Sequence, residues 1–64
     1  MPNYTKYAAL RDSHGVSDAQ VAKAIGISSS TLYDWAHGRY TPKLDKISAL
    51  AGYFGVALEE LLGD

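Results

Sequence analysis

The stretch that decides the fold runs from residue 16 to residue 44 and reads VSDAQVAKAIGISSSTLYDWAHGRYTPKL. It holds two short segments in which apolar residues recur with helical spacing, residues 18–25 and residues 29–37. Only Gly26, Ile27 and Ser28 lie between them. A connection this short that opens with glycine predicts two helices held at a steep angle, which is a helix-turn-helix.

Serines mark the beginnings of both segments. Ser17 opens a Ser-Asp-Ala-Gln sequence, which predicts a capping box at the start of the first helix. Ser28 is the expected N-cap of the second helix. Within that helix Leu32, Trp35 and Ala36 repeat at i, i+3 and i+4, so all three are expected to face the core. Trp35 is therefore assigned to the core rather than to stacking on a base.

Helical spacing extends outward on both sides of this unit. Residues 4–14 form a segment with Asn3 as its expected N-cap. Thr41 and Pro42 mark the expected start of a fourth helix, because proline at the first helical position loses no hydrogen bond. Its apolar stripe consists of Leu44, Ile47, Ala51 and Phe54. The apolar spacing of residues 58–62 predicts a short fifth helix. No segment alternates as a half-buried strand does, so the predicted fold class is all-α, a compact five-helix bundle containing the helix-turn-helix.

The length and composition fit one small domain over residues 1–64. Hydrophobic residues make up 47% of the chain and charged residues 20%, which is too apolar for intrinsic disorder. There is no cysteine, so neither a disulfide framework nor a thiolate metal site is expected. No apolar run approaches the roughly 20 residues that span a bilayer, and the first residues lack the apolar stretch of a signal peptide. The expected location is the cytoplasm, with no membrane partner.

The charge is less informative than the pattern. The formal net charge is −1, whereas domains that bind nucleic acid are usually basic. Three of the seven acidic residues, Glu59, Glu60 and Asp64, lie in the last six positions. The rest of the chain carries six basic and four acidic side chains, so a mildly positive face is expected but not a strong one.

The outward face of residues 29–37 is the candidate for reading bases. A helix that enters a major groove must be polar outward and apolar inward, and this helix fits that requirement. Serine can donate to or accept from several base edges, aspartate can accept from the cytosine amino group, and an aromatic ring can touch a thymine methyl group. The predicted base-reading residues are Ser29, Ser30, Tyr33 and Asp34.

A second group of polar residues flanks this helix and is expected to contact the DNA backbone. Hydroxyl groups, cations and helix N-terminal amides are common partners of phosphate oxygens. The predicted phosphate-contacting residues are Ser28, His37, Arg39, Tyr40 and Lys43.

Residues 16–44 resemble the helix-turn-helix of the phage-repressor/Cro family. The matching positions are Val21, Ala22, Ile25, Gly26, Ile27, Leu32, Trp35, Gly38 and Pro42. Downstream, Leu50, the Phe54-Gly55-Val56 sequence and Leu61 resemble the family's fourth and fifth helices. The resemblance covers nearly the whole chain. It implies a five-helix DNA-binding domain of a phage or bacterial transcriptional regulator, such as a repressor, often acting as a dimer on a palindromic operator.

Two positions depart from that family's pattern. Members often open the first motif helix with a glutamine that meets a phosphate, whereas this chain has Asp18, which a phosphate would repel. Many members also pair an arginine of the first helix with a glutamate of the recognition helix. Here Arg11 holds the first place but Ala36 holds the second. Arg11 is therefore expected to find water, another carboxylate or a phosphate.

Several alternatives remain open on the sequence alone. The same fold could serve as a protein-interaction module that binds another regulator, which the near-neutral charge, Asp18 and Asp34 favour. These residues could also be the head of a longer chain that senses a signal or dimerises. Leucines 58, 61 and 62 could close the core or form a dimer seam.

The sequence offers little for an enzyme or a ligand site. No nucleophile with its base, carboxylate pair or phosphate-cradling loop is apparent, so no enzyme activity, cofactor or small-molecule ligand is expected. His14 and His37 each precede a glycine at a helix end, which predicts caps rather than ligands of a metal ion.

Overall fold

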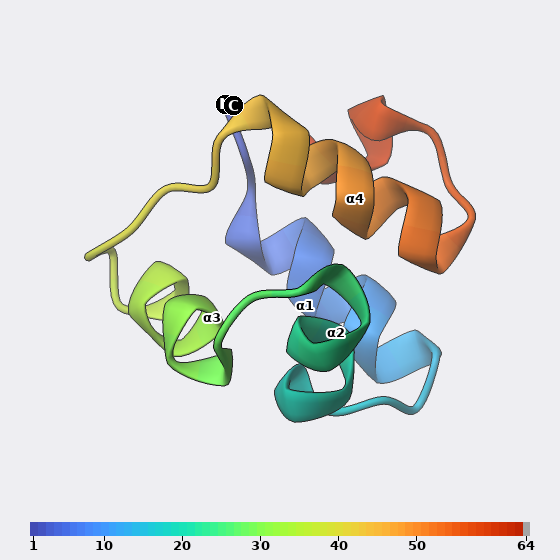
Figure 1. Cartoon of the computed structure of the whole chain (residues 1–64). Coiled ribbons are helices and arrows are strands. Elements are labelled where there is room, and N and C mark those ends of the chain that lie inside the picture. Colours follow the sequence, from blue (N-terminus) through green and yellow to red (C-terminus); the bar gives the residue numbers. More distant parts are fainter. Residues whose placement is uncertain (64) are drawn as a thin grey trace.

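The computed structural model describes residues 1–63, so Asp64, the last residue of the predicted domain, lies outside the described part. Four α-helices and one short 3-10 helix follow one another without a strand in this range (Figure 1). They are α1 (Tyr4–Ser13), α2 (Asp18–Ile25), α3 (Ser29–Ala36), α4 (Leu44–Phe54) and η1 (Leu58–Leu61). The all-α prediction is confirmed. The five-helix count is corrected, because the fifth element is a 3-10 turn of four residues rather than an α-helix.

The three predicted N-caps, Asn3, Ser17 and Ser28, all form hydrogen bonds with backbone amides of the helices that they begin. The side-chain oxygen of Asn3 accepts a hydrogen bond from the backbone amide of Lys6 at 3.1 Å. Ser17 and Gln20 form the complete capping box, with the amide of each donating to the side chain of the other at 2.8 and 3.1 Å. The hydroxyl of Ser28 accepts from the amide of Ser30 at 3.2 Å. Each cap satisfies an amide that has no partner within its helix.

The predicted start of α4 is wrong. The helix begins at Leu44, two residues after Pro42, and its N-cap Lys43 makes no side-chain capping bond. Pro42 is buried in the extended connection that precedes the helix, where its fixed φ is equally well accommodated. Leu44, expected in the apolar stripe, is 64% exposed because it lies in the first turn, beyond the edge of the core. Ala36 is also exposed, since it is the last residue of α3 and only Leu32 and Trp35 of that helix reach the core.

Aromatic rings from three helices fill the centre of the molecule. Trp35 is only 6% exposed, as expected for a core residue, and its ring lies 5.4 Å from that of Tyr4 and 5.3 Å from that of Tyr7. Tyr7 also contacts Phe54, with ring centroids 6.1 Å apart. The remaining core residues are Val21, Ala22, Leu32, Ile47, Leu50, Ala51 and Leu61. The core therefore fixes α3 against α1, and so fixes which face of α3 remains outside.

A polar network joins α1 to the beginning of α2. Asp18 accepts hydrogen bonds from the Tyr7 hydroxyl at 2.6 Å and from Arg11 Nη1 at 3.0 Å. The same Arg11 nitrogen donates to the Tyr4 hydroxyl at 3.1 Å. Burial raises the pKa of the Tyr7 hydroxyl, and its hydrogen bond to Asp18 raises that pKa further. Hydrogen bonds to Asp12, and then to Asp18 and Tyr4, raise the pKa of the Arg11 guanidinium.

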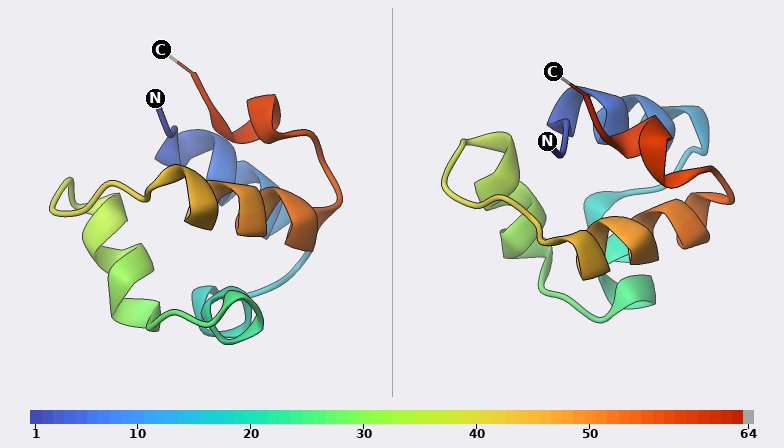
Figure 2. Two further views of the ribbon diagram at one scale, coloured as in Figure 1. Left: turned by 45° about the horizontal axis from the view of Figure 1, so that its top comes forward. Right: turned by 90° about the horizontal axis from the view of Figure 1, so that it is seen from above.

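The two ends of the described chain lie side by side. The amide of Asn3 donates to the carbonyl of Leu61 at 2.9 Å, and the amide of Gly63 donates to the carbonyl of Met1 at 2.8 Å. Pro2 and Leu62 form an isolated antiparallel bridge. Figure 2 shows the two ends close together, on a different side of the molecule from α2. Within residues 1–63, no helix has the length and apolar character needed to cross a membrane.

Candidate nucleic-acid interface

The turn between α2 and α3 sets the direction of α3. Gly26 ends α2 with φ at 81°, in the left-handed region that glycine adopts without strain. The amides of Gly26 and Ile27 both donate to the carbonyl of Ala22 at 2.9 Å. Ile27 packs against the core, and the next residue, Ser28, already caps α3. As a result α3 leaves at a steep angle to α2 and lies at one edge of the molecule (Figure 1).

The four predicted base-reading residues lie together on the outer side of α3. Ser29, Ser30 and Tyr33 are exposed, and the side chain of Asp34 is 43% exposed. Leu32 and Trp35 hold the opposite face of the helix in the core. The helix therefore has the polar outer face and apolar inner face that entry into a major groove requires.

The N-terminal half of this face is held by its own hydrogen bonds. The hydroxyl of Ser28 accepts the amide of Ser30 and lies 2.8 Å from the hydroxyl of Ser30. The two hydroxyl groups are therefore within hydrogen-bonding distance of each other. Both are exposed and lie at the end of α3 where short side chains allow a close approach.

The C-terminal half carries a stacked aromatic pair. The rings of Tyr33 and His37 lie 4.1 Å apart, with an interplanar angle of 26°. His37 Nδ1 lies 2.9 Å from the carbonyl oxygen of Tyr33. Because a carbonyl can only accept, Nδ1 carries a hydrogen in this bond, and Nε2 is the nitrogen left for an external partner. Tyr33 is 53% exposed, so the stack presents its ring at the surface.

A second pair forms where α3 ends. Gly38 has φ at 72°, and the amides of Gly38 and Arg39 donate to the carbonyls of Trp35 and Asp34 at 3.1 and 2.8 Å. These two bonds constitute a Schellman motif, which folds the chain back over the last turn. Arg39 Nη1 consequently lies 3.8 Å from Asp34 Oδ1. Sequence reasoning assigned these residues to different tasks and missed the pair, although a glycine followed by an arginine after a helix was a usable signal.

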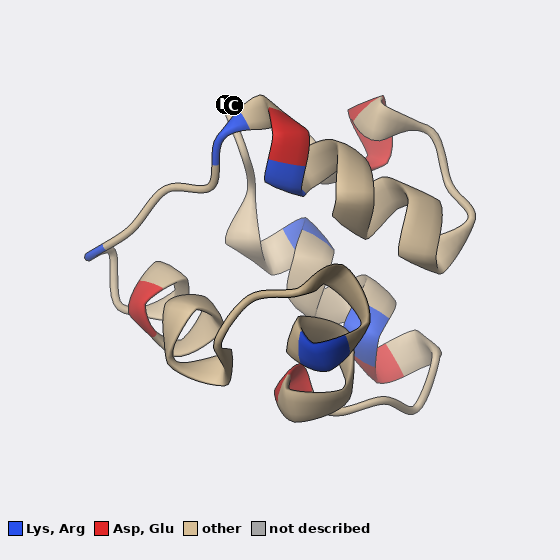
Figure 3. Cartoon of the chain, viewed as in Figure 1, with Lys and Arg blue, Asp and Glu red and all other residues tan. Residues whose placement is uncertain are grey.

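The remaining predicted phosphate contacts lead away from α3 toward α4. Tyr40 is half-buried and packs against the core, whereas Lys43 is exposed. Figure 3 shows basic residues at the outer bend of the loop between α3 and α4 and where this loop meets α4, with acidic residues on α3 and both acidic and basic residues in the first turn of α4. The charge along this edge is therefore mixed and does not form a continuous positive strip.

Asp18 and Ala36, the two positions that depart from the family's pattern, are connected through Arg11. Asp18 does not confront a phosphate with an unpaired charge, because Arg11 and Tyr7 both donate to it. Arg11 finds in Asp18 the carboxylate that Ala36 does not provide. Ala36 is exposed, and Arg11 joins α1 to α2 through its ion pair with Asp18.

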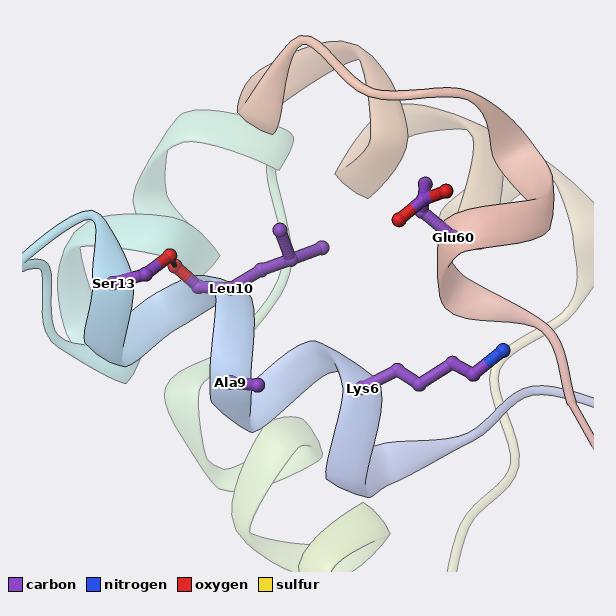
Figure 4. A pocket seen from close by; sticks show the side chains of 5 residues that line it. All are labelled: Lys6, Ala9, Leu10, Ser13 and Glu60. Carbon is purple, nitrogen blue, oxygen red and sulfur yellow. Dashed lines mark hydrogen bonds between the residues drawn. The ribbon is translucent and has the colours of Figure 1, made fainter.

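No other feature of the described residues competes with α3 as a site. A shallow depression of about 380 Å³ lies between α1 and η1, lined by Lys6, Ala9, Leu10, Ser13 and Glu60 (Figure 4). Its lining combines one carboxylate, one amine and one hydroxyl group with apolar side chains. Among residues 1–63, no three His, Cys, Asp or Glu side chains gather where they could hold a metal ion.

The chain matches known proteins along nearly its whole length. A family model described as Helix-turn-helix matches residues 8–61. The cryptic phage CTXphi transcriptional repressor RstR of Vibrio cholerae is 32% identical over 60 residues, which cover 94% of this chain and 54% of that protein. An uncharacterized HTH-type transcriptional regulator of Methanocaldococcus jannaschii is 33% identical over 61 residues, covering 95% of this chain and 89% of that protein. The chain thus spans about half the length of the first relative. With the turn at Gly26 and the outward face of α3, these matches show that the chain belongs to the helix-turn-helix family.

Proposed function

We propose that this chain is a transcriptional regulator that binds double-stranded DNA sequence-specifically, with α3 in the major groove. The observation that carries the proposal is the division of α3 into a buried apolar face and an exposed polar face, placed at an edge of the molecule by the turn at Gly26. Membership of the helix-turn-helix family and the regulators among its relatives support it. The residues that would read base edges are Ser29, Ser30, Tyr33 and Asp34.

Backbone contacts would set the register of α3 in the groove. The Ser28 hydroxyl and the outward nitrogen of His37 flank the two ends of the helix, where phosphate oxygens pass. Tyr40 and Lys43 extend this contact along the loop toward α4, and Arg39 adds a cation next to α3. The charge of Asp18 opposes the approach of a phosphate less than an isolated carboxylate would, because Arg11 neutralises it.

Two copies of the chain would act together on a palindromic site. Adjacent major grooves on one side of a duplex lie about 34 Å apart. The Cα extents of the chain are 24 × 23 × 20 Å, so two copies can lie side by side at that spacing and touch through their side chains. Leu58 and Leu62 are partly exposed and could contribute to the contact, whereas Leu61 is fully buried and could not.

Selection of this chain against a randomised duplex library tests the proposal. We expect enrichment of a half-site or palindromic consensus whose affinity falls as salt rises, because phosphate contacts release counterions. Absence of enrichment, together with no binding at low salt, would refute the proposal. Repeating the selection with the chain fused to a dimerisation segment excludes a failure caused only by weak self-association.

A protein-interaction module on the same fold is the second candidate. The mixed charge along the edge formed by α3 and its following loop favours it, because a nucleic-acid site is usually strongly positive. Salt distinguishes the two candidates. Binding to another regulator through a near-neutral surface would depend weakly on ionic strength, whereas binding to a duplex depends on it steeply.

A further inference from the structure

The pair formed by Asp34 and Arg39 has the chemical form of a base-pair reader. One end of the pair accepts hydrogen bonds and the other end donates them. Both ends reach solvent, since the side chains of Asp34 and Arg39 are 43% and 66% exposed. They lie at the C-terminal end of the face that Ser29, Ser30 and Tyr33 begin. Both side chains of the pair can therefore contact the same ligand.

The major-groove edge of a G·C pair is the complement of this arrangement. Cytosine presents its N4 amino group as a donor, and guanine presents O6 and N7 as acceptors. The N4 and O6 atoms share a Watson–Crick hydrogen bond, so they lie only about 3 Å apart. The Asp34 Oδ1 and Arg39 Nη1 atoms are separated by 3.8 Å, which is close to that spacing. A carboxylate and a guanidinium at this separation can form hydrogen bonds with neighbouring atoms of a single base pair.

We propose that Asp34 and Arg39 together read one G·C base pair, with Asp34 accepting from cytosine N4 and Arg39 donating to guanine O6 and N7. This inference rests on the proposed function and changes the role expected for Arg39 from a phosphate contact to a base contact. A·T pairs fit less well, because a guanidinium finds one acceptor on either base, N7 of adenine or O4 of thymine, where guanine offers two. The choice of base therefore lies mainly with Arg39, whereas Asp34 orients Arg39 and accepts from the amino group of the pairing base.

The position of Arg39 depends on the backbone rather than on the ion pair alone. The Schellman motif at Gly38 ties the Arg39 amide to the carbonyl of Asp34 at 2.8 Å, so the backbone at Arg39 is held against the last turn of α3, which carries Asp34. An exposed ion pair by itself orders its side chains only weakly. The hydrogen-bonded turn limits the directions from which the guanidinium can approach, and this favours a fixed target on a base edge over a diffuse contact with phosphates.

The test compares base preferences of the wild type with those of Arg39→Lys and Asp34→Asn. Each protein is titrated against the selected duplex and against duplexes with every base pair replaced in turn. At one position we expect the wild type to prefer G·C over A·T by about 5- to 150-fold, the range of a good bidentate contact. Both variants should lose most of that preference at the same position, although Arg39→Lys keeps the positive charge.

Lys43→Gln is the control, because Lys43 lies in the loop and has no carboxylate partner within the described ion pairs. It should weaken binding to all duplexes alike and leave the G·C preference in place. Thermal unfolding of each variant establishes that the fold is intact. The inference is overturned if Arg39→Lys and Asp34→Asn keep every base preference, or lose preferences at different positions. Failure of the wild type to bind any duplex would instead overturn the proposed function, and the inference with it.

Discussion

Replacing Asp18 with alanine should destabilise this domain far more than its position on the surface of α2 suggests. The substitution leaves the Tyr7 hydroxyl, on a side chain with no exposed surface, without its acceptor. A buried donor left unsatisfied costs about 1–3 kcal/mol. Loss of the partly exposed ion pair with Arg11 adds up to about 1 kcal/mol. Loss of a negative charge in the first turn of α2 adds about 0.3–1 kcal/mol.

The expected total is about 1–5 kcal/mol, which is a large part of the roughly 3–10 kcal/mol typical of a domain of 64 residues. The midpoint of thermal unfolding should fall by at least about 5 °C. Urea titration followed by tryptophan fluorescence measures the effect directly. Trp35 is the single tryptophan, and its ring contacts those of Tyr4 and Tyr7 in the core.

Asp12→Ala is the matched control, because Asp12 also pairs with Arg11 at 3.0 Å but is 72% exposed. It should cost less than about 1 kcal/mol, as exposed ion pairs do. A double-mutant cycle with Tyr7→Phe isolates the bond between Tyr7 and Asp18, and we expect the two effects to be strongly non-additive. The reasoning is refuted if Asp18→Ala and Asp12→Ala destabilise the domain equally.

Three further predictions follow from other parts of the structure. Because the pKa of Tyr7 is raised in the folded state, the unfolded chain loses this proton at a lower pH than the folded chain does. The free energy of unfolding should therefore fall as pH rises above about 10. Urea titrations should show a smaller fall in Tyr7→Phe. Gly38→Ala should destabilise the domain by about 1–2 kcal/mol, because φ is positive at this position. Gly52→Ala lies inside α4 with equally open space around it and should stabilise the domain by about 0.5–1 kcal/mol. Equal effects of the two substitutions on thermal unfolding would contradict the argument from the backbone conformation. Lys43→Gln should lower the slope of log affinity against log salt by about 1 on any duplex, and an unchanged slope would remove Lys43 from the phosphate contacts.

The features that could be predicted from the sequence are those decided by a few neighbouring residues. Asn3, Ser17 and Ser28 were identified as caps because capping depends on side chains within three residues of the helix start. The short glycine-led turn likewise predicted the relation of α2 to α3. Pro42 was misleading because proline suits an extended connection as well as the first turn of a helix.

The features that could not be predicted depend on which elements the core brings together. Arg11 and Asp18 are seven residues apart and lie on different helices, so their pairing depends on how α1 and α2 pack. Ala36 has the spacing of a core residue, but the core ends one position before it. Sequence reasoning gave Asp34 and Arg39 separate roles, since only the turn at Gly38 brings them together.

The central claim is that the exposed face of α3 chooses the bases, and repeated selection with altered faces tests it most directly. The randomised duplex library is selected with the wild type, with Ser29→Ala, with Tyr33→Ala and with Ser13→Ala, a serine that lines the depression beside α1 and lies away from α3. We predict that Ser29→Ala and Tyr33→Ala each change the preferred bases at particular positions, whereas Ser13→Ala reproduces the wild-type consensus. An identical ranking of sites for all four proteins would contradict the account, because α3 would then not be the element that reads the sequence.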